Sequence, residues 1–172
     1  MSDRPKSAFA PRAPFERWPL QVADEQWGFA WYCGKGVIVT QAAVTHGTQY
    51  AAHSYHDFAD RMLSEHAAEI EAAAGLYVIH DLRLLQTYDA GARRAWTERM
   101  KRRKRGYLRG STVVVDEATP LLKMAVSGIN MMAALSLGSF VELTNDLPGA
   151  LRKYDVQAPR RLSTFPPSRP RP

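Results

Sequence analysis

The sequence has 172 residues, of which 45% are hydrophobic and 23% are charged. This composition suits one folded domain and excludes a wholly disordered chain or a coiled coil. Lys and Arg number 23 against 17 Asp and Glu, a formal charge of +6. Nucleic acid, an anionic membrane surface and an acidic protein are therefore the partner classes to weigh.

The cysteine content and the N-terminal residues indicate the cellular compartment in which the protein is expected. Cys33 is the single cysteine, so no intramolecular disulfide is expected. Residues 1–20 lack the regions of a signal peptide. The apolar stretch 120–141 contains Lys123 and Asn130 and is a poor candidate for a bilayer span. We expect a cytoplasmic protein without a transmembrane segment.

Proline is concentrated at both ends of the sequence, in residues 1–20 and 157–172. These segments are predicted to be mobile tails around one domain at 21–156, because proline removes backbone donors and the segments lack paired apolar runs. The functional alternative for the C-terminal tail, PPSRPRP, is a polyproline ligand or a basic arm.

The first predicted elements form a hairpin followed by a helix. Two β-prone runs, 27–32 and 37–44, flank a glycine-containing turn at 33–36 and favour antiparallel pairing. Ser54 then marks the start of a helix at 54–74, with Asp57 as its capping partner and Gly75 as its end.

Three strand and helix pairs follow in the sequence. Short apolar strands joined through helices favour parallel neighbours buried under those helices. The predicted fold class is α/β, with a mixed, mainly parallel sheet, an N-terminal hairpin and the order ββαβαβαβα. The three pairs are strand 76–79 with helix 88–104, strand 112–115 with helix 120–135, and strand 140–143 with helix 147–154.

This order carries a resemblance. The strand 77–82, the segment Tyr88-Asp89-Ala90-Gly91 at the next helix, the strand 113–115 and the apolar helix after it resemble the STAS domain of anti-sigma-factor antagonists. More closely, they are similar to the divergent stand-alone STAS-like proteins of bacteria. The resemblance covers residues 27–156 and implies a non-enzymatic signalling domain that binds another protein.

In that family, a serine following an aspartate in the loop after the third strand accepts a phosphate from a partner kinase. Asp89 matches the aspartate, but the next residue is Ala90, which has no hydroxyl. The usual phosphoswitch is therefore not expected. Thr87 and Tyr88 are the nearby hydroxyls that could replace the serine; alternatively, Thr87 caps the following helix.

Signatures of catalysis are absent from the sequence. It has no nucleophile elbow, P-loop or dinucleotide fingerprint, so we expect neither an enzyme nor a cofactor. Cys33 is interpreted as an inert thiol. His53, His56, Asp57 and Asp60 fall close together, but they do not match the spacing of a metal site, and a polar first helical turn is the favoured interpretation.

A ligand site is a second hypothesis. His80 and Asp81 end a predicted strand and Arg83 follows, at the carboxyl end of the sheet where open α/β folds bind ligands. A lipid or nucleotide would be the small ligand of such a site.

A basic run is the strongest anomaly in the sequence. Residues 93–109 carry nine basic side chains against Glu98 alone, and we expect most of them to face outward. An acidic protein, nucleic acid and an anionic membrane are the candidate partners, with nucleic acid disfavoured because no recognition motif accompanies the charge. The predicted patch comprises Arg93, Arg94, Lys101, Arg102, Arg103, Lys104, Arg105 and Arg109.

The predicted helix 120–135 is the second anomaly, because its apolar residues cover more than one stripe. Methionine is an adaptable contact residue, so this helix is a candidate interface for a partner or for a homodimer. The sequence thus predicts a protein-binding surface formed by the loop before the second helix and by the apolar helix. Its members are Leu84, Thr87, Tyr88, Asp89, Met124, Met131 and Met132.

Overall fold

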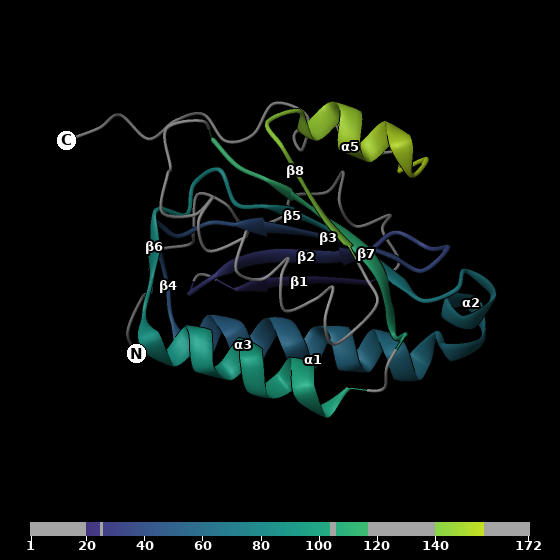
Figure 1. The fold of residues 1–172 in the computed structure, drawn as a ribbon, viewed down its shortest axis with the longest axis horizontal. Helices are drawn as coiled ribbons and strands as arrows, with labels where there is room; N and C mark the ends of the chain where they lie inside the picture. Colours follow the sequence, from purple (N-terminus) through teal and green to yellow (C-terminus); the bar gives the residue numbers. More distant parts are fainter. Residues whose placement is uncertain (1–19, 25, 104–105, 117–139, 157–172) are drawn as a thin grey trace, which may run out of the picture.

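A six-stranded sheet forms the centre of the computed structural model, which describes residues 20–24, 26–103, 106–116 and 140–156. The first two strand pairings are antiparallel and the other three are parallel. The fold is therefore α/β with a mixed, mostly parallel sheet (Figure 1). In spatial order the strands are β1 (Leu20–Asp24), β2 (Gly28–Tyr32), β3 (Val37–Ala42), β5 (Leu76–Asp81), β7 (Leu108–Val114) and β8 (Phe140–Thr144).

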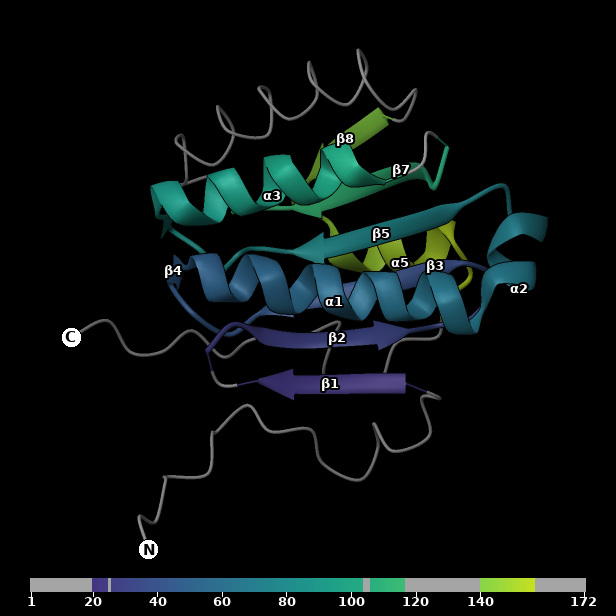
Figure 2. The same ribbon diagram turned by 90° about the horizontal axis from the view of Figure 1, so that it is seen from below.

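Helices cover both faces of the sheet. Helices α1 (Gln49–Glu65) and α3 (Ala90–Arg102) lie side by side on one face, and α5 (Leu147–Lys153) lies on the other (Figures 1 and 2). Helix α1 connects β3 to β5, and α3 connects β5 to β7, so both connections move across the sheet in the same direction. Because crossovers between parallel strands have the same handedness, both helices lie on the same face.

Strands β2, β3 and β5 at the centre of the sheet are buried on both sides, as strands covered by helices on both faces must be. Side chains alternate along each strand, so Ile38 and Val78 pack beneath α1, whereas Val39 and Ile79 pack against α5. In the part of the chain that the structure describes, no helix is both long and apolar enough to cross a membrane.

The turn between β2 and β3 lies where the sequence predicts it. Gly34, Lys35 and Gly36 all have positive φ, from +51° to +81°, which explains the two glycines. Strand β1 lies outside the predicted elements, because its five residues begin at the end of the proline-rich segment. The sequence also does not predict the two-residue strands β4 (His46–Gly47) and β6 (Thr87–Tyr88), which pair in parallel and are too short to show a periodic pattern.

The predicted helix at 54–74 needs correction. Helix α1 begins five residues earlier because Thr48 is the N-cap: its backbone is extended and its Oγ1 accepts a hydrogen bond from the Ala51 amide. Ser54 lies inside the helix and accepts a hydrogen bond from Trp27 Nε1 instead. A non-helical residue, His66, separates α1 from the short helix α2 (Ala67–Ala72).

The later elements differ from prediction mainly at their ends. Helix α3 begins at Ala90 rather than at 88, β7 extends back to Leu108, and β8 and α5 lie where they are predicted. The predicted helix 120–135 and both predicted tails lie outside the described residues, apart from Leu20, which belongs to β1.

Gly28 is expected to be irreplaceable at the start of β2. Its φ is +144°, and a Cβ there would lie 1.9 Å from the carbonyl oxygen of Gln41. Gly28→Ala should lower the free energy of unfolding by about 3 kcal/mol, measured by urea denaturation. Gly106→Ala is the control, because its φ is also positive but a Cβ would meet nothing within 4 Å. Equal losses in the two variants would contradict the steric argument.

Candidate functional site

Polar residues end two neighbouring parallel strands. Thr40 and Gln41 on β3 stand in register with His80 and Asp81 on β5. Because side chains alternate along a strand, Thr40 and its neighbour His80 face the α1 and α3 side of the sheet, whereas Gln41 and its neighbour Asp81 face the α5 side. His80 and Asp81, predicted to share one ligand site, therefore point to opposite faces.

Asp81 is the centre of a closed network on its side of the sheet. Its carboxylate is 2% exposed and accepts hydrogen bonds from Gln41 Nε2 at 3.1 Å and from Arg83 Nε and Nη2 at 2.8 and 2.9 Å. The two-pronged contact raises the pKa of the Arg83 guanidinium. Asp81 and Arg83 thus form an ion pair with each other, and this network holds the chain after β5 in place.

His80 lies under the two helices. Its Nδ1 is 2.8 Å from Thr40 Oγ1, and its ring packs near Tyr55 and Trp96, with centroids 5.2 and 5.8 Å away. Burial lowers the pKa of His80 to about 4, so the ring is neutral at neutral pH.

The loop predicted to bind a partner divides into exposed and structural residues. Thr87 is exposed and its Oγ1 lies 2.7 Å from His46 Nδ1. Tyr88 packs against the cluster around Val113, and Leu84 is half-buried. Asp89 caps α3, accepting a 2.5 Å hydrogen bond from the Ala92 amide, so the suggestion that Thr87 caps this helix is wrong. Met124, Met131 and Met132 lie outside the described residues.

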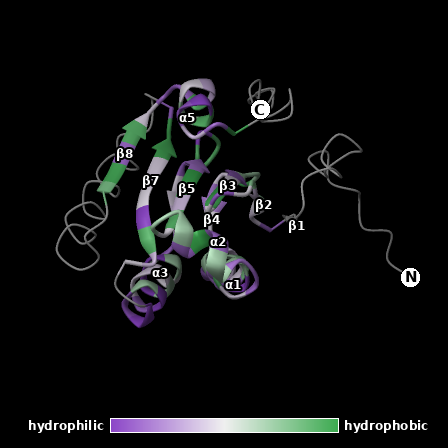
Figure 3. Cartoon of the chain, turned by 90° about the vertical axis from the view of Figure 1, so that its right-hand side faces the viewer, coloured by the Kyte–Doolittle hydropathy of each residue, from purple (hydrophilic) through white to green (hydrophobic). Residues whose placement is uncertain are grey.

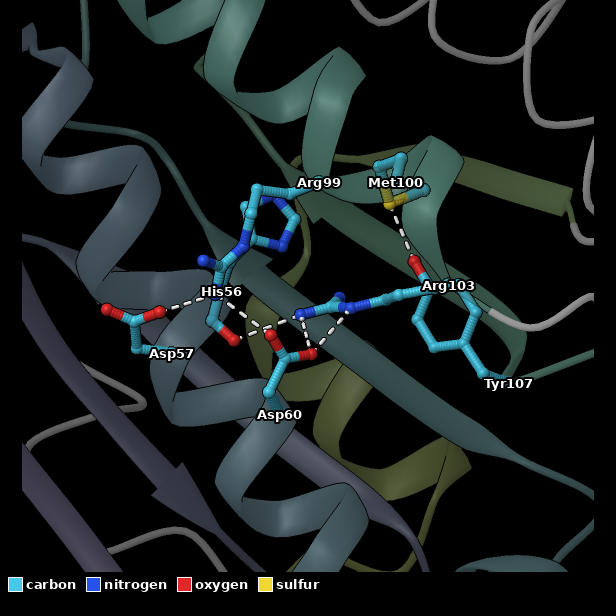
Figure 4. A network of polar contacts seen from close by, with 7 residues as sticks. All are labelled: His56, Asp57, Asp60, Arg99, Met100, Arg103 and Tyr107. Atoms are coloured by element: carbon cyan, nitrogen blue, oxygen red, sulfur yellow. Dashed lines mark hydrogen bonds and ion pairs between the residues drawn. The ribbon is translucent and has the colours of Figure 1, made fainter.

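The basic run does not face outward as a whole. Arg99 binds Asp57 and Asp60, the second at 2.8 Å, and Arg103 binds Asp60 and the His56 carbonyl oxygen (Figure 4). The Arg103 side chain is only 8% exposed. Its assignment to a solvent-facing patch is therefore wrong, because α1 presents carboxylates opposite the end of α3.

Arg109 also has a structural role. It lies on β7, and its guanidinium donates to the carbonyl oxygens of Ala73 at 2.9 Å and Lys35 at 3.2 Å. It also lies near the rings of Tyr77 and Tyr154. Arg109 therefore clamps two loops together and does not extend the basic patch. Lys104 and Arg105 lie outside the described residues.

Four cations remain on what we call the outer face of α3. Arg93, Arg94, Lys101 and Arg102 are exposed, and none of them forms an ion pair with another described residue. Glu98 is exposed among them. Figure 3 shows the hydrophilic side of α3 turned away from the sheet. This face is the strongest candidate site because its charge has no structural use within the described residues.

The spacing of the charged residues on the two helices is a sequence signal for these contacts. Asp57 and Asp60 are three residues apart on one helix, whereas Arg99 and Arg103 are four apart near the end of another, so each pair shares a helix face. Opposite charges at such spacings favour packing of the two helices against each other.

Neither a cluster of metal ligands nor a reactive cysteine is found among the described residues. No group of three or more potential His, Cys, Asp or Glu ligands occurs in the described ranges. Burial raises the pKa of the Cys33 thiol to about 12, so it stays protonated at neutral pH.

Cys33 is therefore expected to resist alkylation. At pH 8, iodoacetamide should modify the folded protein at least tenfold more slowly than the same protein in 6 M guanidinium chloride, as intact mass would show. Equal rates would contradict the assignment of Cys33 as an inert thiol.

Comparison with known proteins gives no family assignment. No protein-family model matches the sequence, and no curated protein matches it.

Proposed function

We propose that this chain is a non-enzymatic regulatory domain of the STAS type that binds an acidic protein surface through the outer face of α3. The observation that carries the proposal is the division of the basic run. Arg99 and Arg103 are neutralised by α1, whereas Arg93, Arg94, Lys101 and Arg102 stay exposed without ion pairs among the described residues. Such a face steers and orients an oppositely charged partner.

The arrangement of elements supports the STAS part of the proposal. The resemblance implies a hairpin followed by strand and helix repeats. In the structure, β2 and β3 form a hairpin, and β5, β7 and β8 then pair in parallel in the order in which they occur along the chain. Asp89 caps α3 and Ala90 follows it, so the proposed regulation does not use the family's phosphoserine.

The outer face favours a protein over the other anionic partners. Glu98 lies among the four cations, where it repels a polyphosphate but can meet a basic residue on a protein. None of the exposed large apolar residues described, Tyr50, Phe140 and Leu143, lies on α3. A helix that lies on a membrane surface needs such residues beside its cations.

Affinity capture from the native host tests the proposal. The tagged full chain should retain one acidic protein in stoichiometric amount after nuclease and detergent treatment. Arg94→Glu/Lys101→Glu should lose that protein, whereas Arg61→Glu/Arg152→Glu, with the same charge change on α1 and α5, should keep it. Release of the bound material by nuclease or by detergent, or equal retention by both variants, would refute the proposal.

A further inference from the structure

His56 is buried in the contact between α1 and α3, which we call the α1–α3 seam. Its side chain is 0% exposed, and neither ring nitrogen has a hydrogen-bond partner among the described residues. The ring packs instead against Trp96 of α3 and Tyr55 of α1, with centroids 4.5 and 5.0 Å away. A buried imidazole without partners loses the hydrogen bonds that water would give it. Figure 4 shows His56 beside the arginine network of the seam.

Charged groups around His56 oppose a proton on its ring. The guanidinium groups of Arg99 and Arg103 lie nearby, and both are already bonded to the carboxylates of α1. Burial and these two cations lower the pKa of His56 to about 2. The titratable groups that act on the ring are Arg99 and Arg103 from the end of α3, His53 from α1 and His80 from β5. Asp57 and Asp60 of α1 bind the two arginines, and Tyr107 lies against Arg103.

Helix α3 has fewer buried side chains than α1. Its buried residues are Ala92 and Ala95, joined by the half-buried Trp96. In contrast, α1 buries six side chains, including Phe58 and Met62. Elements with few buried apolar side chains open at lower free energy than the rest of a fold, so α3 can separate while the sheet stays intact.

We propose that the α1–α3 seam is a proton-operated latch, in which acidification releases α3 from α1 and leaves the sheet folded. Docking requires a neutral His56 in the seam and a neutral His80 beneath Trp96. Release exposes both rings to water, where they take up protons. The latch concerns the attachment of α3 and does not depend on the partner proposed above.

The direction of the pH effect follows from the two histidines. When α3 is released, the pKa of each ring returns to about 6.5, whereas docking holds it near 2 for His56 and near 4 for His80. Docking is therefore strongest above pH 6.5 and weakens as the pH falls. Each histidine contributes about tenfold between pH 7.5 and 5.5, because a released ring takes up its proton mainly below pH 6.5, so the pair should shift the docking equilibrium about a hundredfold over this range.

Hydrogen exchange measured by mass spectrometry on the full chain tests the latch. After correction for intrinsic rates, amides of α3 should lose about a hundredfold in protection between pH 7.5 and 5.5, as two exposed histidines require. Amides of α5 should change by less than about threefold. Unchanged protection of α3, or equal losses in α3 and α5, would overturn the inference.

Two variants separate the histidines. His56→Phe removes one titrating ring, so the loss of protection in α3 should shrink to about tenfold. His53→Gln, one turn away on α1, should keep the wild-type response. If His56→Phe does not fold, NMR titration of the wild type decides. The His56 ring should take up its proton well below pH 6.5 and together with the loss of protection in α3, whereas a ring that titrates near pH 6.5 while α3 stays protected contradicts the latch.

Discussion

Replacing Asp81 with alanine should lower the free energy of unfolding by about 3 kcal/mol, because it leaves the Arg83 guanidinium and the Gln41 amide without their shared acceptor. Asp81 is 2% exposed and the Arg83 side chain is 24% exposed, so solvent compensates only part of the loss. Urea denaturation at pH 7 measures the effect. The change leaves a partly buried cation without its carboxylate directly after β5.

Two controls show whether burial is the cause. Asp155→Ala breaks an ion pair of similar length, 2.9 Å to Lys35, but both side chains are more than three-quarters exposed. It should cost about 0.5 kcal/mol or less. A double-mutant cycle of Asp81→Ala and Arg83→Ala should give a coupling energy of about 2 kcal/mol. A coupling near zero would mean that the two side chains act independently.

The fold class could be predicted because its signals are local. Glycines at 34 and 36 set the hairpin turn, and the apolar runs that form β5 and β8 lie where the pattern places them. The helix starts were less predictable. Thr48 and Ser54 are both good N-cap residues, and the choice between them depends on Trp27, a residue distant in sequence that occupies the Ser54 hydroxyl.

The candidate site could be predicted only in part because tertiary contacts divide it. The basic run is visible in the sequence, but the neutralisation of Arg99 and Arg103 depends on α1 packing against α3. Strand alternation alone could have shown that His80 and Asp81 face opposite sides of the sheet. Nothing local marks His56, whose burial depends on Trp96 of the neighbouring helix and whose ring nitrogens have no hydrogen-bond partner in the described part of the chain.

Charge reversal on the outer face of α3 has the largest effect expected on binding. Arg94→Glu/Lys101→Glu should weaken the affinity for the captured acidic protein on the order of a hundredfold, because like charges then meet across the contact. Both side chains are exposed and unpaired among the described residues, so the fold should be unaffected. Calorimetric titration at about 100 mM salt measures the dissociation constant, since higher salt screens the effect.

The control keeps the net charge equal. Arg61 on α1 and Arg152 on α5 are exposed, and Arg61→Glu/Arg152→Glu changes the net charge by the same amount. This variant should bind within about threefold of the wild type, because distant surface charges act weakly through screened solvent. If both variants lose affinity equally, the partner responds to net charge and the outer face of α3 is not its docking surface.

Site-specific photo-crosslinking tests the location of the contact most directly. A benzoylphenylalanine placed at Glu98, in the centre of the outer face of α3, should give a covalent adduct with an acidic protein in the native host. The same residue placed at Glu65, exposed near the end of α1, should give none. An adduct from position 65 alone, or an adduct from position 98 with nucleic acid in place of protein, would contradict the account.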